Sequence, residues 1–207
     1  LAHRLLRLVQ EATRENLGFF LIYYTALGAD MADPMDKILH KASKRCRKLE
    51  YSMLADAFDQ QAGEAIQHCR AMKDDTKIWL DWWNKKHQLN LSAKDYLRHP
   101  SMPSIQASRD LHEDIVAYQS PYAELAIAYE LQRTEMIHSF TLIKLAILKF
   151  GTGALRRLGF IRRAIQLKHH KPINKKLLMD FLQENPETRA AMIEKARASL
   201  LIYGDFL

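Results

Sequence analysis

The sequence predicts an all-α fold, a single-domain helical bundle of about seven or eight helices. Gly and Pro number only 7 and 6 among 207 residues, whereas Leu, Ala, Lys, Arg, Glu and Gln, which favour helices, are abundant. Hydrophobic residues make up 48% of the chain and charged residues 27%, which is typical of a globular protein. Apolar residues recur at helical spacing between the proline and glycine breaks. The expected domain spans residues 1–207 and is large enough to bury a full core.

The breaks in this pattern define the expected helices. Gly28 should end the first helix, and Asp33 followed by Pro34 should begin the second as N-cap and first helical residue. Gly151 and Gly153 should end the most apolar helix. The expected helices cover about 2–27, 34–72 with a continuation towards 86, a short segment before Pro100, 104–118, 121–150, 154–170, 173–184 and 186–203.

The apolar run near the start of the chain and the two cysteines indicate where in the cell the protein is expected. The apolar run 17–28 is shorter than the roughly 20 residues of a membrane-spanning helix, so a buried core helix is expected and no membrane span. Cys46 and Cys69 belong to no C-x-x-C pair, which predicts two free, buried or half-buried thiols and a cytoplasmic protein.

The chain is basic, with a net charge of +7, and between residues 156 and 176 it carries eight Lys or Arg and no acid. This charge favours anionic partners, such as an acidic protein, a phosphorylated ligand or an anionic lipid surface. Nucleic-acid binding is not expected, because the sequence lacks zinc-finger spacing, an RNP-type aromatic strand and basic-region heptads. A solvated basic face remains the alternative.

Three groups of polar residues are candidates for a site. Glu64 and His68 are four residues apart and share a helix face, and Glu135 and His138 have the E-x-x-H spacing of metal-binding bundles. An ordinary surface pair or a structural hydrogen bond would explain each pair equally well. In "FIRRAIQLKHHKP", residues 160–172, two adjacent histidines point about 100° apart on a helix. The lysines beside them disfavour a metal cation and favour an anion.

Nucleophile elbows, P-loops, dinucleotide-binding glycine motifs and the H-E-x-x-H motif are absent from the sequence. The stretches "EAIQHCRAMKDD", "SPYAELAIAYELQRTE", "FIRRAIQLKHHKPINKKLLMDFLQENP" and "ARASLLIYGDFL" nevertheless resemble the heme-oxygenase-like, TenA-type helical fold, in particular its iron-containing redox branch. The resemblance extends over about residues 50–207. It implies a non-heme diiron oxidase that uses dioxygen, with His68 and Asp75 matching ligand positions on the first ligand helix.

The sequence departs from that family pattern at several ligand positions. Gln132 stands where the central helix of the family has a glutamate. Ala164, Lys168 and Lys171 stand at the three positions of the H-x-x-x-D-x-x-H pattern. A diiron site needs roughly four carboxylates to balance its two cations, so these substitutions weigh against it.

Two hypotheses follow from the resemblance and its departures. One is an O₂-dependent non-heme iron oxidoreductase that acts on a small organic or carrier-bound substrate. Its predicted iron ligands are Glu64, His68, Glu135, His138 and His169. The alternative is a metal-free relative, a pseudoenzyme, whose basic pocket binds an anionic ligand or an acidic partner. Its predicted anion-binding residues are Lys168, Lys171, Arg163 and Gln132. Either protein could form a homodimer.

Overall fold

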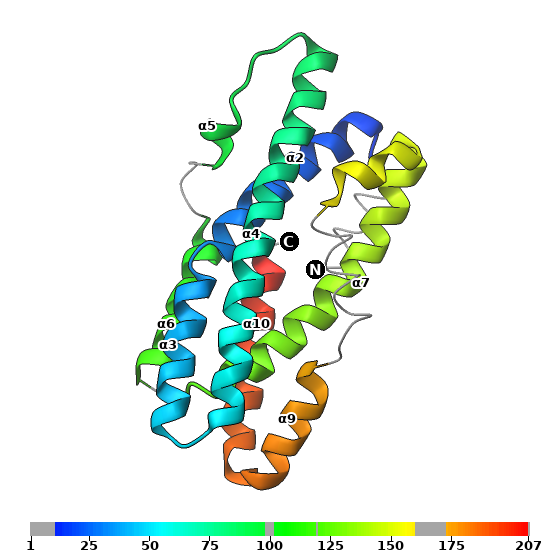
Figure 1. Ribbon diagram of the computed structural model, residues 1–207. Coiled ribbons are helices and arrows are strands. Elements are labelled where there is room, and N and C mark those ends of the chain that lie inside the picture. The colour runs from blue at the N-terminus through cyan, green and yellow to red at the C-terminus, as the bar shows by residue number, and fades with distance from the viewer. Residues whose placement is uncertain (1–10, 98–101, 119, 160–172, 207) are drawn as a thin grey trace.

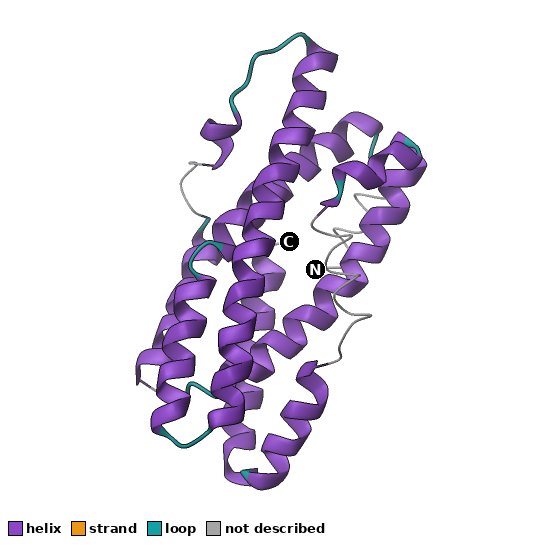
Figure 2. Ribbon diagram, viewed as in Figure 1, coloured by secondary structure: helices purple, strands orange, loops and turns teal. Residues whose placement is uncertain are grey.

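The computed structural model describes residues 11–97, 102–118, 120–159 and 173–206, which form an all-α single domain. Within these ranges there are eight α-helices, two short 3₁₀ segments and no strand (Figures 1 and 2). The α-helices are α2 (Arg14–Ala32), α3 (Met35–Lys48), α4 (Ser52–His87), α5 (Ala93–Leu97), α6 (Pro103–Tyr118), α7 (Ala123–Phe150), α9 (Ile173–Glu184) and α10 (Arg189–Phe206). The 3₁₀ segments are η1 (Thr152–Arg157) and η2 (Pro186–Thr188).

The first described helix, α2, does not end at Gly28, so that prediction was wrong. A Cβ atom at Gly28 would lie 2.8 Å from Cε of Met72 in α4, and the glycine therefore permits close helix packing. The predicted break at Asp33 and Pro34 is confirmed, but Asp33 does not cap α3. Its carboxylate instead accepts a hydrogen bond from Lys73 of α4 at 2.5 Å.

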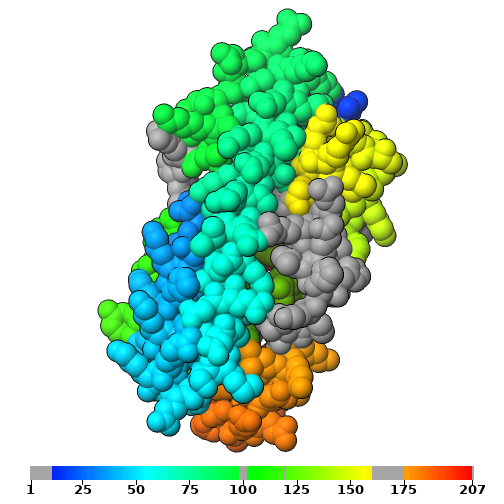
Figure 3. All heavy atoms as spheres, in the orientation of Figure 1, coloured from blue at the N-terminus to red at the C-terminus, as the bar shows by residue number. Residues whose placement is uncertain are grey.

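Helix α4 is the longest helix of the described chain and runs the length of one face of the molecule (Figure 3). The predicted long helix from 34 is broken at residues 49–51, and its second half continues to His87 as expected. Gln88 ends α4 in the left-handed conformation, with φ at 55°. Asn84 fixes the following loop, since its amide group donates to the Leu91 carbonyl at 2.8 Å and accepts from the Leu91 amide at 3.0 Å.

The later breaks follow the predictions closely. Helix α7 ends at Gly151, whose φ of 77° favours glycine. The short helix α5 and the longer helix α6 lie where they were expected. Residues 152–157, however, form the 3₁₀ segment η1, so the predicted α-helix does not begin at residue 154. The rest of that predicted helix, within 160–172, lies outside the described residues.

The apolar side chains form two hydrophobic cores stacked along the bundle. One core, the upper core, includes Trp79 of α4 and is formed mainly by α2, α4 and α7, towards the upper end of the molecule in Figure 1. The lower core is centred on Phe58, between α3, α4, α6 and the first turns of α7. Helices α4, α7 and α10 contribute to both cores, and Leu131 of α7 packs against both. The cores therefore belong to one connected interior.

Both predictions about the cysteines and the apolar run 17–28 hold. Cys46 and Cys69 are free and buried, and the run 17–28 lies within the packed helix α2. Among the described helices, none has the length and apolar character needed to cross a bilayer.

Candidate functional site

Ionisable side chains from facing helices lie at the junction of the two cores. His68 of α4 lies between Ala62, in the lower core, and Met72, in the upper core. Glu135 of α7 lies in the same way between Ile127 and Leu142. The structure therefore places two of the sequence-predicted site residues where α4 and α7 pass from one core to the other.

Glu135 is a carboxylate of this junction whose pKa is shifted. Burial among apolar side chains raises its pKa, and the charge of His68 opposes that rise. The electrostatic influence of His68 on Glu135 acts between helices α4 and α7. A half-buried carboxylate that interacts electrostatically with a half-buried imidazole can act as an acid, a base or a metal ligand.

Two tyrosines and a histidine adjoin Glu135. The side chains of Tyr24 in α2 and Tyr203 in α10 are hydrogen-bonded to each other, and burial, reinforced by the charge of Glu135, raises the pKa of both. The His138 ring stacks on Tyr203, with centroids 6.2 Å apart. Burial lowers the pKa of His138, and its Nδ1 has no hydrogen-bond partner in the described part of the chain. A neutral imidazole with a free nitrogen therefore stands beside the junction.

The two acidic residues of α4 that accompany His68 in the sequence lie in different surroundings. Glu64 is half-buried and accepts a hydrogen bond from Gln60 at 3.0 Å. Asp75 is only 3% exposed, and a Cβ atom at Gly159 would lie 3.0 Å from its Oδ1. Asp75 thus packs closely against Gly159, just after η1.

The predicted ligand sets are described only in part. Across residues 11–97, 102–118, 120–159 and 173–206, no three His, Cys, Asp or Glu side chains gather closely enough to hold a metal ion. The predicted metal ligand His169 and the predicted anion-binding residues Arg163, Lys168 and Lys171 lie outside these ranges. Gln132, the remaining anion-binding candidate, is exposed on α7. Of the predicted site residues, His68 and Glu135 interact electrostatically between α4 and α7, and the predicted ligand set stays a prediction.

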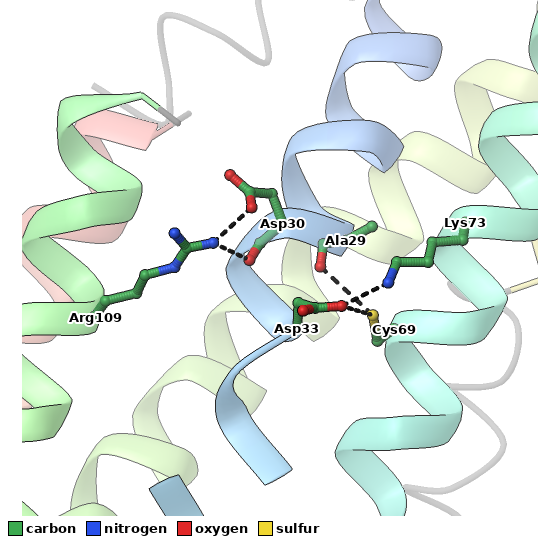
Figure 4. A network of polar contacts seen from close by, with 6 residues as sticks. All are labelled: Ala29, Asp30, Asp33, Cys69, Lys73 and Arg109. Carbon is green, nitrogen blue, oxygen red and sulfur yellow. Dashed lines mark hydrogen bonds and ion pairs between the residues drawn. The ribbon is translucent and has the colours of Figure 1, made fainter. Parts of the chain in front are cut away.

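Sequence reasoning missed a polar network at the C-terminal end of α2 (Figure 4). The Lys73 ammonium lies 2.5 Å from Oδ1 of Asp33, and this hydrogen bond lowers the pKa of Asp33. The Cys69 thiol donates to the Ala29 carbonyl at 3.5 Å, and burial raises its pKa. Because the thiol stays protonated, Cys69 packs as a structural residue rather than acting as a nucleophile. On the other side of α2, Arg109 of α6 contacts Asp30 at 2.5 Å.

A buried ion pair between α6 and α7 was also missed. Nδ1 of His112 lies 2.8 Å from Oε2 of Glu124, and both side chains are at most 3% exposed. Burial alone would lower the pKa of His112, but the charge and hydrogen bond of Glu124 outweigh it and raise the pKa. The only sequence signal was the presence of two ionisable residues on otherwise buried faces of two helices, where a polar side chain needs a partner.

Comparison with protein-family models, curated proteins and solved structures finds no match. The resemblance to the heme-oxygenase-like fold therefore rests on sequence motifs, and the structure supports its all-helical character alone.

Proposed function

We propose that the chain is a helical-bundle non-heme iron oxidoreductase that acts on a small organic or carrier-bound substrate at the junction of the two cores. The observation that carries the proposal is the electrostatic interaction of Glu135 in α7 with His68 in α4, in surroundings that raise the pKa of Glu135. Strongly perturbed ionisable groups inside a protein cost stability and are concentrated at functional sites. Helical bundles place metal ligands in the same way, on facing helices that point inward.

The donor set suits iron in its chemistry. Carboxylate and neutral imidazole are ligands for non-heme iron, which would supply dioxygen activation when bound. His68 and Glu135 would be the ligands from the described residues. A cation between them would favour the ionised form of Glu135 and so offset the cost of burying it. Tyr203 and His138 would shape the adjacent wall and exclude water from it.

Two ligands do not complete an iron site. The described residues bring no third His, Cys, Asp or Glu close to the pair, so further ligands would have to come from elsewhere, with His169 as the predicted contributor. A centre with two iron ions would require more carboxylates than the described junction offers. The proposal is therefore limited to iron binding that requires His68 and Glu135.

Anaerobic loading with Fe(II), followed by desalting and metal analysis, tests this requirement. We expect about one iron ion or more per wild-type chain, and a loss of most of it in His68→Ala and in Glu135→Gln. Glu130→Gln is the matched control, because Glu130 lies on the same helix but pairs with Arg133 at 3.2 Å. Less than about 0.2 iron per wild-type chain, or equal loading of all variants, would contradict the proposal.

The second candidate is a metal-free protein that binds an anionic ligand or an acidic partner. It is favoured by the absence of a third ligand near His68 and Glu135 within the described ranges, and by the net charge of +7. Its predicted contacts are Lys168, Lys171, Arg163 and Gln132, of which Gln132 alone is described and is exposed on α7. A rise in melting temperature with millimolar phosphate, lost in Lys168→Ala and unaffected by Fe(II), would support this candidate and not the first.

A further inference from the structure

Two charged stripes of opposite sign run side by side on the surface of the bundle. Helix α3 carries a basic stripe of exposed lysines, Lys37, Lys41, Lys44 and Lys48. Helix α6 carries an acidic stripe of exposed carboxylates, Asp110, Glu113 and Asp114. The spacing within the basic stripe, four, three and four residues, keeps its side chains on one helix face. The two helices are in contact and lie next to each other in Figure 1.

A hollow of about 440 Å³ lies between the stripes. Lys41 and Lys44 form its basic wall, and Glu113 and Asp114 form its acidic wall. Ile38 is among the apolar residues that line it. None of the four charged side chains has a hydrogen bond or ion pair within the described part of the chain. The walls therefore present unpaired charge around a partly apolar hollow.

Hydrogen bonds from Arg45 fix the shape of the hollow at the end of α6. Arg45 of α3 donates from Nη1 to the Val116 carbonyl at 2.8 Å and also to the Ala117 carbonyl, which fastens the last turn of α6 to α3. Tyr118 follows directly and is 83% exposed, the highest exposure among the large apolar side chains of the described chain. A rigid hollow with an exposed aromatic side chain at its rim has the character of an interface anchor and its pocket.

We propose that this face, formed by the basic and acidic stripes, binds a second copy of the chain in a symmetric dimer. A two-fold axis that runs along the hollow places α3 of each copy on α6 of the other. Each lysine wall then meets a carboxylate wall, and the same set of contacts forms twice, as an isologous interface requires. A two-fold axis across the hollow would instead place lysine on lysine, which like-charge repulsion disfavours.

The charges argue against other occupants of the hollow. A strongly acidic peptide or a nucleic acid would be attracted by Lys41 and Lys44 but repelled by Glu113 and Asp114. A basic segment would be attracted by Glu113 and Asp114 but repelled by Lys41 and Lys44. A second copy carries both signs in the required arrangement, so it satisfies both walls at once.

Sedimentation equilibrium of the full chain across a range of concentrations tests the dimer. We expect a reversible monomer–dimer equilibrium that weakens at high salt, because the wall charges are solvent-exposed. The double variants Lys41→Glu/Lys44→Glu and Glu113→Lys/Asp114→Lys should each dimerise at least about tenfold more weakly than the wild type. Mixing the two variants should restore association as a heterodimer, because the first carries two acidic walls and the second two basic walls.

Lys77→Glu/Lys85→Glu is the matched control, since both lysines are exposed on α4, away from the hollow. Circular dichroism and thermal unfolding show whether each variant is folded before its association is compared. A wild-type chain that stays monomeric at every concentration overturns the proposal. So does a dimer that neither wall variant weakens, or a failure of the mixed variants to associate when each is folded. None of these outcomes depends on iron, so the dimer and the proposed function can fail separately.

Discussion

The buried pair of His112 and Glu124 provides the most direct test of the energetics of this fold. The perturbation is Glu124→Gln, which keeps the shape of the side chain and removes its charge. In the wild type, Glu124 accepts a hydrogen bond from His112 at 2.8 Å inside the lower core, where water cannot replace either partner. Removing one member of a buried ion pair leaves the other uncompensated and costs about 3–5 kcal/mol.

The pH dependence of this cost has a defined sign. In the wild type, Glu124 raises the pKa of His112 above its unfolded value of about 6.5. The stabilisation from the protonated pair is therefore fully present below pH 6.5, roughly, and is lost as the pH rises through the folded pKa. In Glu124→Gln, burial remains without the opposing charge and should lower the pKa of His112. The contribution of His112 to stability then increases with pH up to about 6.5.

Urea unfolding, followed by circular dichroism between pH 5 and pH 9, measures both effects. At pH 6 we expect Glu124→Gln to lower the free energy of unfolding by about 3 kcal/mol, or the melting temperature by roughly 6–12 °C. The loss should shrink as the pH rises. The control is His40→Gln, because His40 contacts Asp59 at a similar distance, 2.9 Å, but with both side chains about half exposed. It should cost less than about 1 kcal/mol.

Two outcomes would refute this reasoning. A Glu124→Gln variant that costs no more than His40→Gln at pH 6 would mean that the buried pair contributes little beyond an exposed pair. A cost that is constant from pH 5 to pH 9 would mean that Glu124 does not control the protonation of His112. Either result would require another account of the contact between α6 and α7.

Two further predictions concern packing and thiol chemistry. Gly18→Ala should destabilise the chain by about 1–3 kcal/mol in urea unfolding, because the new Cβ would lie 2.4 Å from Trp82. Gly63 lies in open space within α4, so Gly63→Ala should stabilise the chain by up to about 1 kcal/mol. Equal effects of the two substitutions would contradict the packing argument. Cys46 and Cys69 should react with a thiol reagent only after unfolding. Burial raises the pKa of both thiols, to about 12 for Cys46, and so keeps them protonated. Rapid labelling of the native protein would contradict this prediction, because it would show that a thiol is accessible.

Local sequence signals predicted most of the helices, because helix ends are governed by nearby residues. Gly151 ended α7 as expected, since the chain there adopts a φ of 77° that favours glycine. Gly28 misled the same reasoning, because its role depends on Met72, which α4 brings against it from far along the chain. A glycine that permits close packing and a glycine that ends a helix look alike in the sequence. The difference between them is a tertiary contact.

The candidate site shows the same limit. The spacing of Glu135 and His138 matched that of metal-binding bundles, and both residues lie near Tyr203. The electrostatic interaction of Glu135 with His68, however, joins two different helices, and no local pattern encodes it. Glu64 shares a face with His68 but contacts Gln60, so shared spacing alone does not bring residues into one site. The predicted ligand His169 lies outside the described residues, and its role stays a prediction.

The continuity of α4, α7 and α10 through both hydrophobic cores has a consequence for how the molecule opens. Each of these helices would have to break in the middle for one core to melt while the other stayed folded. The slowest-exchanging amides beside Trp79 and beside Phe58 should therefore exchange through the same global opening, with similar protection. Any molecule that binds at the junction of the cores would then slow amide exchange in both by the same factor, even though it touches only their shared boundary.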